Sequence, residues 1–222
     1  MAITLDARLL TAAEMARAGM RVVDVGTDHA YLPAWLVERG IISSAIATDI
    51  RPGPLRNAAE TLRRAGLEKQ VQLRLCDGLR GIEAEEADDI FICGMGGEQI
   101  AAIIADAPWL RDFDKQLILQ PMTRAERLRS FLFRNGFAIR EERVARDAKG
   151  RLYPILRVRY TGEVVQPTEL LCRVGNMKNR DYLAKQARQL RKQAAGLRRA
   201  KDEGEAARGL ELEQLAEEIE NL

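Results

Sequence analysis

Residues 21–30 read Arg-Val-Val-Asp-Val-Gly-Thr-Asp-His-Ala, and this stretch decides the fold. The apolar, β-branched run before Gly26 predicts a buried strand, and residues 30–39 predict a helix directly after a tight turn. In a strand–turn–helix unit of this kind, backbone N–H groups and the start of the helix can meet a ligand. Asp24 comes near the end of the strand, where its carboxylate can fix the turn or meet a cation.

A second apolar run, residues 45–48, ends at Asp49. An acidic residue at this point of a βαβ unit can accept both ribose hydroxyls of a nucleoside cofactor. A dinucleotide is disfavoured, because Gly26-Thr-Asp-His-Ala-Tyr31 lacks two of the three glycines of the Gly-x-Gly-x-x-Gly fingerprint. Taken alone, the stretch is equally compatible with Asp24 as a turn residue and Asp49 as a helix cap.

The strand–helix pattern repeats along the first three quarters of the chain. It predicts strands at residues 21–25, 44–49, 71–75, 89–93 and 116–120, and helices at 32–39, 54–65, 98–105 and 124–134, after a short N-terminal amphipathic helix. Residues 137–146 and 152–160 flank Lys149-Gly150 and predict a β-hairpin. The expected fold class is α/β, with a parallel sheet covered on both faces and closed by an antiparallel hairpin.

Composition narrows the class of protein. Of the 222 residues, 46% are hydrophobic and 31% charged, a profile typical of a globular protein. The N-terminus lacks the apolar core of a signal peptide, and no apolar run approaches the roughly 20 residues that span a bilayer, so we expect a cytoplasmic protein without a membrane partner. One histidine and three distant cysteines, Cys76, Cys93 and Cys172, predict neither a metal site nor a disulfide framework.

Pro167 marks an expected boundary between a domain of residues 1–166 and one of residues 167–222. Beyond it Leu183, Leu190 and Leu197 recur every seven residues. Residues 168–202 hold ten Lys/Arg against three Asp/Glu, whereas residues 203–222 hold seven Glu and one Arg. This pattern predicts a basic and an acidic helix, paired antiparallel, with the break flanked by Gly204 and Gly209. A dimerising coiled coil is the alternative, but fewer than four heptads favour pairing within one chain and hence a monomer.

Five motifs together resemble one family over nearly the whole chain. They are Asp24–Pro33, Ala47–Asp49, Cys76–Leu79, Ile92–Gly97 and Leu119–Met122, of which Asp28-His-Ala-Tyr-Leu-Pro33 and Gly94-Met-Gly-Gly97 are the most specific. The set is similar to that of the bacterial tRNA (adenine-22-N1)-methyltransferases. The resemblance implies a Rossmann-like class I methyltransferase fold with a C-terminal helical coiled-coil domain. It also implies S-adenosyl-L-methionine as cofactor, tRNA as substrate, and in-line SN2 transfer of a methyl group to N1 of an adenine.

The resemblance also implies a cofactor site. Asp24 and Gly26 would surround the methionine part, Asp49 would hold the ribose, and Asp77, followed by Gly78, would accept a hydrogen bond from the adenine amino group. The implied set is completed by Asp28, His29, Ile50, Cys93 and Gly94. Two alternatives stay open at this point: Asp77-Gly78 as a turn without a ligand, and Cys93 as a buried inert thiol.

The implied catalytic residues are Asp28, His29, Gly94 and Met95. The glycines of residues 94–97 follow the fourth strand, where they would allow a flat base to approach the backbone. N1 of adenine carries a lone pair, so no strong base is required; Asp28 would accept from the adenine amino group. The structural alternatives are His29 as a helix cap or an orienting partner of Asp28, and Met95 as a lid or core filler.

The implied substrate-binding residues fall into two groups. Near the pocket they are Tyr31, Gly96, Gly97, Gln120 and Pro121, with a core position for Tyr31 and a helix cap at Gly97 as alternatives. On the basic helix they are Lys178, Arg180, Lys185, Arg188 and Arg191, joined by Lys192, Arg198 and Arg199, some of which would instead pair with the acidic helix. Rival functions are a methyltransferase acting on a small molecule or protein and a non-catalytic RNA-binding protein.

Overall fold

The structure is a computed structural model that describes residues 3–198 and 202–222. The chain divides into two compact units, Met1–Gln166 and Pro167–Leu222.

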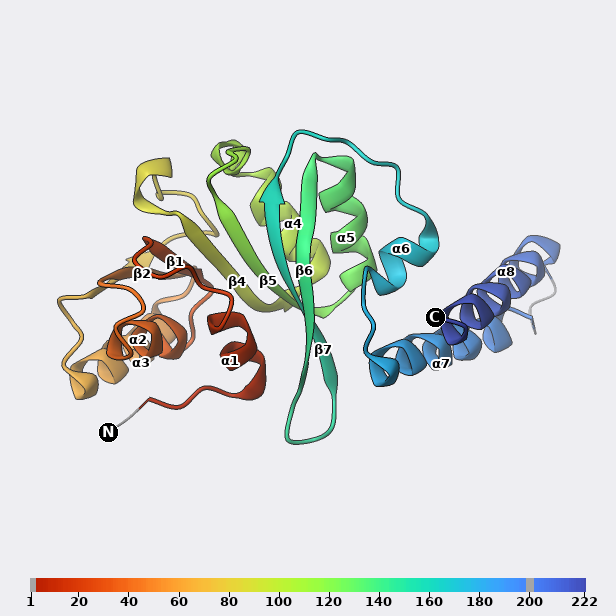
Figure 1. Cartoon of the computed structure of the whole chain (residues 1–222). Coiled ribbons are helices and arrows are strands. Elements are labelled where there is room, and N and C mark those ends of the chain that lie inside the picture. Colours follow the sequence, from red (N-terminus) through yellow and green to blue (C-terminus); the bar gives the residue numbers. More distant parts are fainter. Residues whose placement is uncertain (1–2, 199–201) are drawn as a thin grey trace. The chain divides into compact units, whose positions relative to one another are not determined.

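The first unit is built on a seven-stranded sheet (Figure 1). Its strands are β1 (Val22–Val25), β2 (Ala45–Asp49), β3 (Val71–Leu75), β4 (Asp89–Gly96), β5 (Gln116–Thr123), β6 (Phe137–Arg146) and β7 (Leu152–Tyr160). The order is β3-β2-β1-β4-β5-β7-β6, with β1 to β5 parallel and β7 antiparallel to both neighbours. The predicted parallel sheet closed by a hairpin is therefore confirmed. Because the order reverses between β1 and β4, the carboxyl ends of these strands border the crevice where ligands bind in open α/β sheets.

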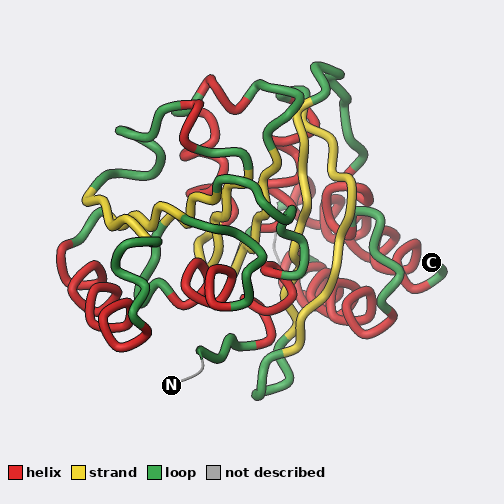
Figure 2. Tube along the Cα trace, turned by 60° about the vertical axis from the view of Figure 1, so that its left-hand side comes forward, coloured by secondary structure: helices red, strands yellow, loops and turns green. Residues whose placement is uncertain are grey.

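Helices cover both faces of this sheet (Figure 2). Alternate strand residues point to opposite sides, so Val22 packs in one core cluster and Val23 in the other. The first cluster contains residues of α1 (Ala7–Ala13), α2 (Tyr31–Glu38) and α3 (Pro52–Ala65). The second contains residues of α4 (Gly97–Ala105) and α5 (Ala125–Arg134). Two short 3₁₀ turns, η1 (Ala84–Glu86) and η2 (Pro108–Leu110), were not predicted.

β4 and β5 are longer than predicted. Residues 94–96 and 121–123, expected to be loops, continue the two strands. Cys93 pairs with Gln120 and Met95 with Pro121, and register shifts on both sides of Met95 mark an irregular, bulged ladder. Gly94 at this bulge has a φ of +80°, and the bulge also tolerates Pro121, which has no N–H to donate to a regular ladder. Tertiary pairing, rather than local sequence, extends these strands.

The second unit contains α6 (Glu169–Val174), α7 (Arg180–Leu197) and α8 (Glu203–Glu220), of which α6 was not predicted. Ion pairs of 2.7 Å join Arg191 to Glu220 and Arg198 to Glu213. A step of seven residues forward on α7 thus matches seven backward on α8, as an antiparallel pair requires. The buried seam between them is formed by Leu183, Leu190, Ala194, Leu212, Leu215 and Ile219.

The two glycines expected to flank the helix break lie inside α8 instead. A Cβ at Gly209 would stand 2.9 Å from Arg198 Cγ and 3.2 Å from the Ala194 carbonyl oxygen. Gly209 therefore permits the close approach of α8 to α7, which is why a residue with low helix propensity stands within a helix. Among residues 3–198 and 202–222, no helix has the length and apolar character needed to cross a membrane.

Candidate active site

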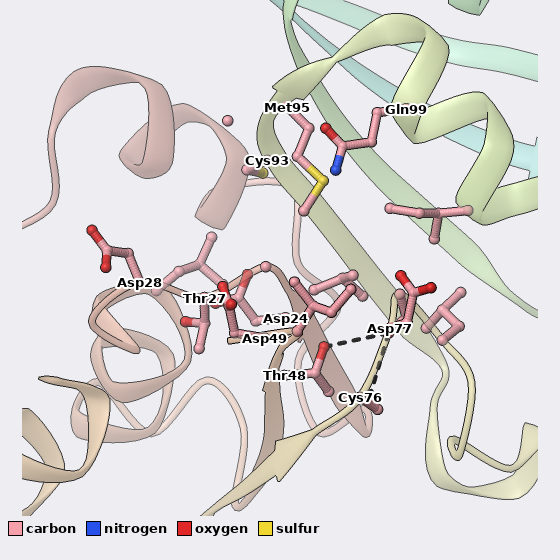
Figure 3. Close-up of a pocket in the computed structure, with 18 of the residues that line it drawn as sticks. Asp24, Thr27, Asp28, Thr48, Asp49, Cys76, Asp77, Cys93, Met95 and Gln99 are labelled. Atoms are coloured by element: carbon pink, nitrogen blue, oxygen red, sulfur yellow. Dashed lines mark hydrogen bonds between the residues drawn. The ribbon is translucent and has the colours of Figure 1, made fainter. Parts of the chain in front are cut away.

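A cleft of about 790 Å³ opens at the carboxyl ends of β1 to β4 (Figure 3). The turns after these four strands line it, together with parts of α1 and α4. From the implied cofactor and catalytic sets, it brings together Asp24, Gly26, Asp28, His29, Asp49, Ile50, Asp77, Gly78, Cys93, Gly94 and Met95. Residues separated by up to 71 positions in the chain thus share one cavity, because the ends of parallel strands meet at one edge of the sheet.

Asp24 is a buried carboxylate at the floor of the cleft. It lies in β1 with 6% of its surface exposed, and burial raises its pKa from 3.8 to about 6, although a hydrogen bond with the Thr27 side chain opposes the rise. Thr27 in turn accepts a hydrogen bond of 3.1 Å from the Ala30 backbone N–H. The carboxylate is therefore held by the turn, in surroundings that disfavour its charge unless a cation lies beside it.

The turn at Gly26 is closed from two sides. The N–H groups of Gly26 and Thr27 donate to the Thr48 carbonyl oxygen at 2.8 and 2.7 Å. Gly26 has a φ of +76°, and a Cβ built there would overlap the Met95 Cε atom. Met95, carried by the bulge in β4, therefore lies across the turn as a wall of the cleft, and it also packs against the second core cluster.

Asp49 ends β2 and is also buried. Its Oδ1 accepts a hydrogen bond of 2.8 Å from the Arg51 backbone N–H, and the Arg51 Nε lies 3.8 Å away. The backbone bond fixes the carboxylate at the start of α3, where it also lines the cleft. Ile50, next to it, is 61% exposed and offers an apolar surface to the same cavity.

The Asp77-Gly78 turn is held from two strand ends. Thr48 Oγ1 and Cys76 Sγ both donate to the Gly78 carbonyl oxygen, at 3.5 and 3.6 Å (Figure 3). Gly78 has a φ of +60°, which favours glycine. The Asp77 side chain stays more than half exposed and lies 3.4 Å from Arg80, so it remains accessible from the cleft.

Four implied substrate residues do not line the cleft: Gly96, Gly97, Gln120 and Pro121. Gly97 is the buried first residue of α4, packed against the Arg124 carbonyl group, and the helix cap is Gly96. Gln120 is fully buried in β5, where its Oε1 accepts hydrogen bonds from the Gly94 N–H at 3.1 Å and from Arg8 Nη1 at 3.0 Å. It therefore holds the bulge in position from behind instead of forming the far wall.

The structure corrects two further alternatives. His29 does not cap α2, because the cap position is Ala30 and no side chain accepts there. Its Nε2 instead lies 3.4 Å from Asp28 Oδ2. Tyr31 is not in the core: it is 41% exposed, and it lines the cleft. Cys93 is half-buried and lines the cleft, and burial strongly raises its pKa, so the thiolate is disfavoured there.

Sequence reasoning missed several residues of the cleft, notably Arg8 on α1 and Gln99 and Ile103 on α4. Arg8 reaches Gln120 across 112 positions of sequence and also pairs with Asp6 at 2.6 Å. No local pattern distinguishes such an arginine from a solvated one, so only the packing of α1 against the sheet identifies it. Within the described ranges, no group of three His, Cys, Asp or Glu side chains is arranged to hold a metal ion.

Comparisons with known proteins agree with this geometry. Residues 5–156 match the family described as a methyltransferase domain. The Streptococcus pneumoniae protein Sp1610, assigned as a tRNA (m1A22) methyltransferase and solved in complex with S-adenosyl-L-methionine, is 33% identical. The match covers 98% of this chain and 100% of that one, with a TM-score of 0.83. The chain belongs to the bacterial tRNA (m1A22) methyltransferase family.

Further members of the tRNA (m1A22) methyltransferase family support the assignment. The structure of the TrmK tRNA methyltransferase of Bacillus subtilis is 29% identical, with 98% of this chain and 99% of that one covered and a TM-score of 0.82. In sequence, the tRNA (adenine(22)-N(1))-methyltransferase of B. subtilis strain 168 is 37% identical over 154 residues. This alignment covers 69% of the present chain and spans 64% of that relative's length.

Proposed function

We propose that this chain is an S-adenosyl-L-methionine-dependent methyltransferase that modifies N1 of adenine 22 in tRNA. The observation that carries the proposal is the cleft itself, which gathers Asp24, Asp49 and Asp77 from three successive strand ends beside the bulge at Gly94. A protein that only binds RNA has no need of this arrangement. The solved relative that contains S-adenosyl-L-methionine covers the chain almost end to end.

The residues of the cleft fit this cofactor. Burial disfavours the ionised form of Asp24 unless a cation lies beside it, so this carboxylate suits the ammonium group of the methionine part. Asp49, fixed by the Arg51 N–H, suits the two ribose hydroxyls. Asp77 suits the adenine amino group, and the apolar Ile50 suits the flat base. A cavity of about 790 Å³ is ample for a ligand of this size.

The bound cofactor supplies a methyl group activated by a sulfonium, which the lone pair on N1 of adenine takes in line. The chain contributes position: Met95 and the Gly26 turn bound the reacting end of the cleft, and Gln120 holds the Gly94 bulge from behind. Positive charge passes to the base during transfer, and Asp28, whose side chain is 70% exposed beside the cleft, offers a carboxylate to the adenine amino group.

The proposal is tested with the purified protein, labelled S-adenosyl-L-methionine and an unmodified tRNA transcript, followed by mass spectrometry of the nucleosides. We expect 1-methyladenosine in the wild-type transcript and none in a transcript with guanine at position 22. A label that stays out of the RNA while the cofactor binds would instead favour a small-molecule or protein substrate.

Asp49→Ala is expected to weaken binding of S-adenosyl-L-methionine about 10- to 100-fold, since hydrogen bonds to a charged group contribute about 1.5–3 kcal/mol. Titration calorimetry measures the affinity, and circular dichroism checks that the fold is retained. Asp114→Ala removes an exposed carboxylate outside the cleft and serves as the matched control. Equal affinities in both variants would remove Asp49 from the ribose.

For the tRNA, we propose that residues 167–222 supply contacts to phosphate groups. The ion pairs within that unit separate the basic side chains that have an acidic partner from those that have none among the described residues. Arg191 and Arg198 are engaged by Glu220 and Glu213. Arg188 and Lys192 are exposed and form no ion pair among the described residues, as is also true of Lys178 and Arg180. Lys185 is half-buried, and burial lowers its pKa. Arg199 lies outside the described residues.

A double variant Arg188→Ala, Lys192→Ala is expected to weaken tRNA binding and to reduce the slope of log K against log salt by about 1–2, because each phosphate contact contributes roughly 0.7–0.9. Fluorescence anisotropy between 50 and 200 mM salt measures both quantities. The matched control, Arg191→Ala with Arg198→Ala, removes as much charge from side chains that already have partners. The same loss in both double variants would show that only net charge matters.

We also propose that the enzyme acts as a cytoplasmic monomer. The pairing of α7 with α8 supports a monomer, because the apolar seam of each helix is buried within one chain. The proposed tRNA substrate supports the location of the enzyme in the cytoplasm.

A further inference from the structure

Two aromatic rings form a parallel stack at the side of the cleft. The His29 and Tyr31 ring centroids are 5.0 Å apart, and their planes differ by only 10°. Both residues line the cavity. With Tyr31 41% exposed, the pair presents a planar aromatic surface that the folded chain leaves accessible.

An unusual backbone conformation between the two rings holds them in this stack. Ala30, between the two rings, has a φ of +53° and a ψ of +25°, a left-handed conformation that residues other than glycine rarely adopt. Its side chain is completely buried and its N–H is held by Thr27 Oγ1. The surrounding fold therefore imposes an unfavourable conformation at the one residue that separates the rings, and such positions cluster at ligand sites.

The two rings lie away from the part of the cleft that suits the adenine of the cofactor. His29 and Tyr31 follow β1, a few residues after the Gly26 turn that the Met95 side chain covers, whereas Asp77 follows β3. β2 stands between β1 and β3 in the sheet. The stack therefore lies at the β1 end of the cleft, on the side of the proposed reacting end and away from the β3 end that suits the cofactor's adenine.

We propose that the His29–Tyr31 pair is a stacking platform for the target purine base, which lies against it as a third ring. This inference rests on the proposed function. An adenine within a folded tRNA has to leave its own stack to reach an active site, and stacking on protein rings returns part of that cost. In the described part of the chain no further ring joins the pair, so the platform is available to a base.

Asp28 adds selectivity at the edge of the platform. Its Oδ2 lies 3.4 Å from His29 Nε2, and its side chain is 70% exposed. A carboxylate accepts a hydrogen bond from the 6-amino group of adenine, but it repels the 6-oxo group of guanine. The platform thus binds any purine ring, and Asp28 favours adenine.

The test compares Tyr31→Leu, which keeps apolar bulk without a ring, with Tyr31→Phe, which keeps the ring. We expect kcat/KM for tRNA to fall about 10- to 100-fold in the leucine variant and no more than about threefold in the phenylalanine variant, in line with stacking contributions to single-strand binding. The dissociation constant for S-adenosyl-L-methionine should stay within about twofold in both, since the rings lie away from its base. His29→Leu and His29→Phe provide a second pair with the same expected order.

Phe113→Leu is the matched control, because Phe113 is an exposed ring, paired with Tyr160, outside the cleft. Its activity should equal that of the wild type. Two results would overturn the platform, provided that the wild type forms 1-methyladenosine. One is an equal loss of activity in the leucine and phenylalanine variants. The other is a loss of affinity for S-adenosyl-L-methionine that parallels the loss of activity. A wild type that forms none would overturn the proposed function and the platform together.

Discussion

Asp24→Asn is expected to make the protein more stable at pH 8 while removing most of its affinity for S-adenosyl-L-methionine. The carboxyl group is buried, and its pKa of about 6 in the folded chain exceeds the ordinary value of 3.8. A shift of this size corresponds to about 3 kcal/mol of destabilisation once the group is ionised. Asparagine keeps the shape and the acceptor for Thr27 but carries no charge.

The pH dependence follows from the direction of the shift. Below pH 3.8 the carboxyl is protonated in both the folded and unfolded states, so its favourable contribution is fully present. As the pH rises through 3.8 to about 6, the unfolded chain loses its proton first, and stability falls. We therefore expect Asp24→Asn to melt about 6–12 °C above the wild type at pH 8 and close to it at pH 4. Asp28→Asn, at an exposed carboxylate, should change the melting temperature little at either pH.

The affinity for S-adenosyl-L-methionine should depend on pH in the opposite direction from the stability. The ammonium of the methionine part stabilises the ionised form of Asp24, so wild-type affinity should decrease below about pH 6, where binding has to release a proton. In Asp24→Asn we expect roughly a hundredfold loss or more, by analogy with removal of one partner from a buried pair, and no such pH dependence. Calorimetry in two buffers with different ionisation enthalpies measures both quantities. Unchanged affinity in the variant would show that Asp24 only shapes the turn.

Gly97→Ala is the second change with a large expected effect. A Cβ at this position would overlap the Arg124 carbonyl oxygen and stand 2.9 Å from the Arg124 carbonyl carbon, and backbone atoms cannot rotate away as a side-chain tip does. Arg124 itself is held at a φ of +57° at the start of α5. The junctions β4–α4 and β5–α5 would have to separate, at a cost of about 1–3 kcal/mol or more.

Thermal denaturation of Gly97→Ala is expected to show a melting temperature lower by about 3–10 °C. Methylation should fall as well, because the same junction carries the bulge that places Gly94 and Met95. Gly196→Ala is the matched control: it is also a helical glycine, but a Cβ there meets nothing within 4 Å, and alanine has the higher helix propensity. A Gly97→Ala protein as stable as the Gly196→Ala protein would contradict this account of the junction.

Most elements of the first unit could be predicted closely because hydrophobic periodicity and turn residues mark them locally. The apolar run before Gly26 and the run before Asp49 became β1 and β2 within one residue of the expected bounds. Both acidic residues line the cleft, because parallel topology alone brings strand ends together. The extension of β4 through Gly94 was not predictable in this way, since glycine favours a loop and only pairing with β5 makes it a strand.

The sequence by itself determined the order of strands and helices, the fold class and the acidic residues at the strand ends. Hydrophobic periodicity and turn residues act over a few neighbours in the chain, and they leave their pattern in the sequence. Only the tertiary structure decided that Gln120 supports Gly94 from behind, that Arg8 joins the cleft, that Arg191 is engaged by Glu220, and that His29 and Tyr31 stack. These outcomes depend on packing between distant segments, or on a backbone conformation at Ala30 that the fold imposes against local preference.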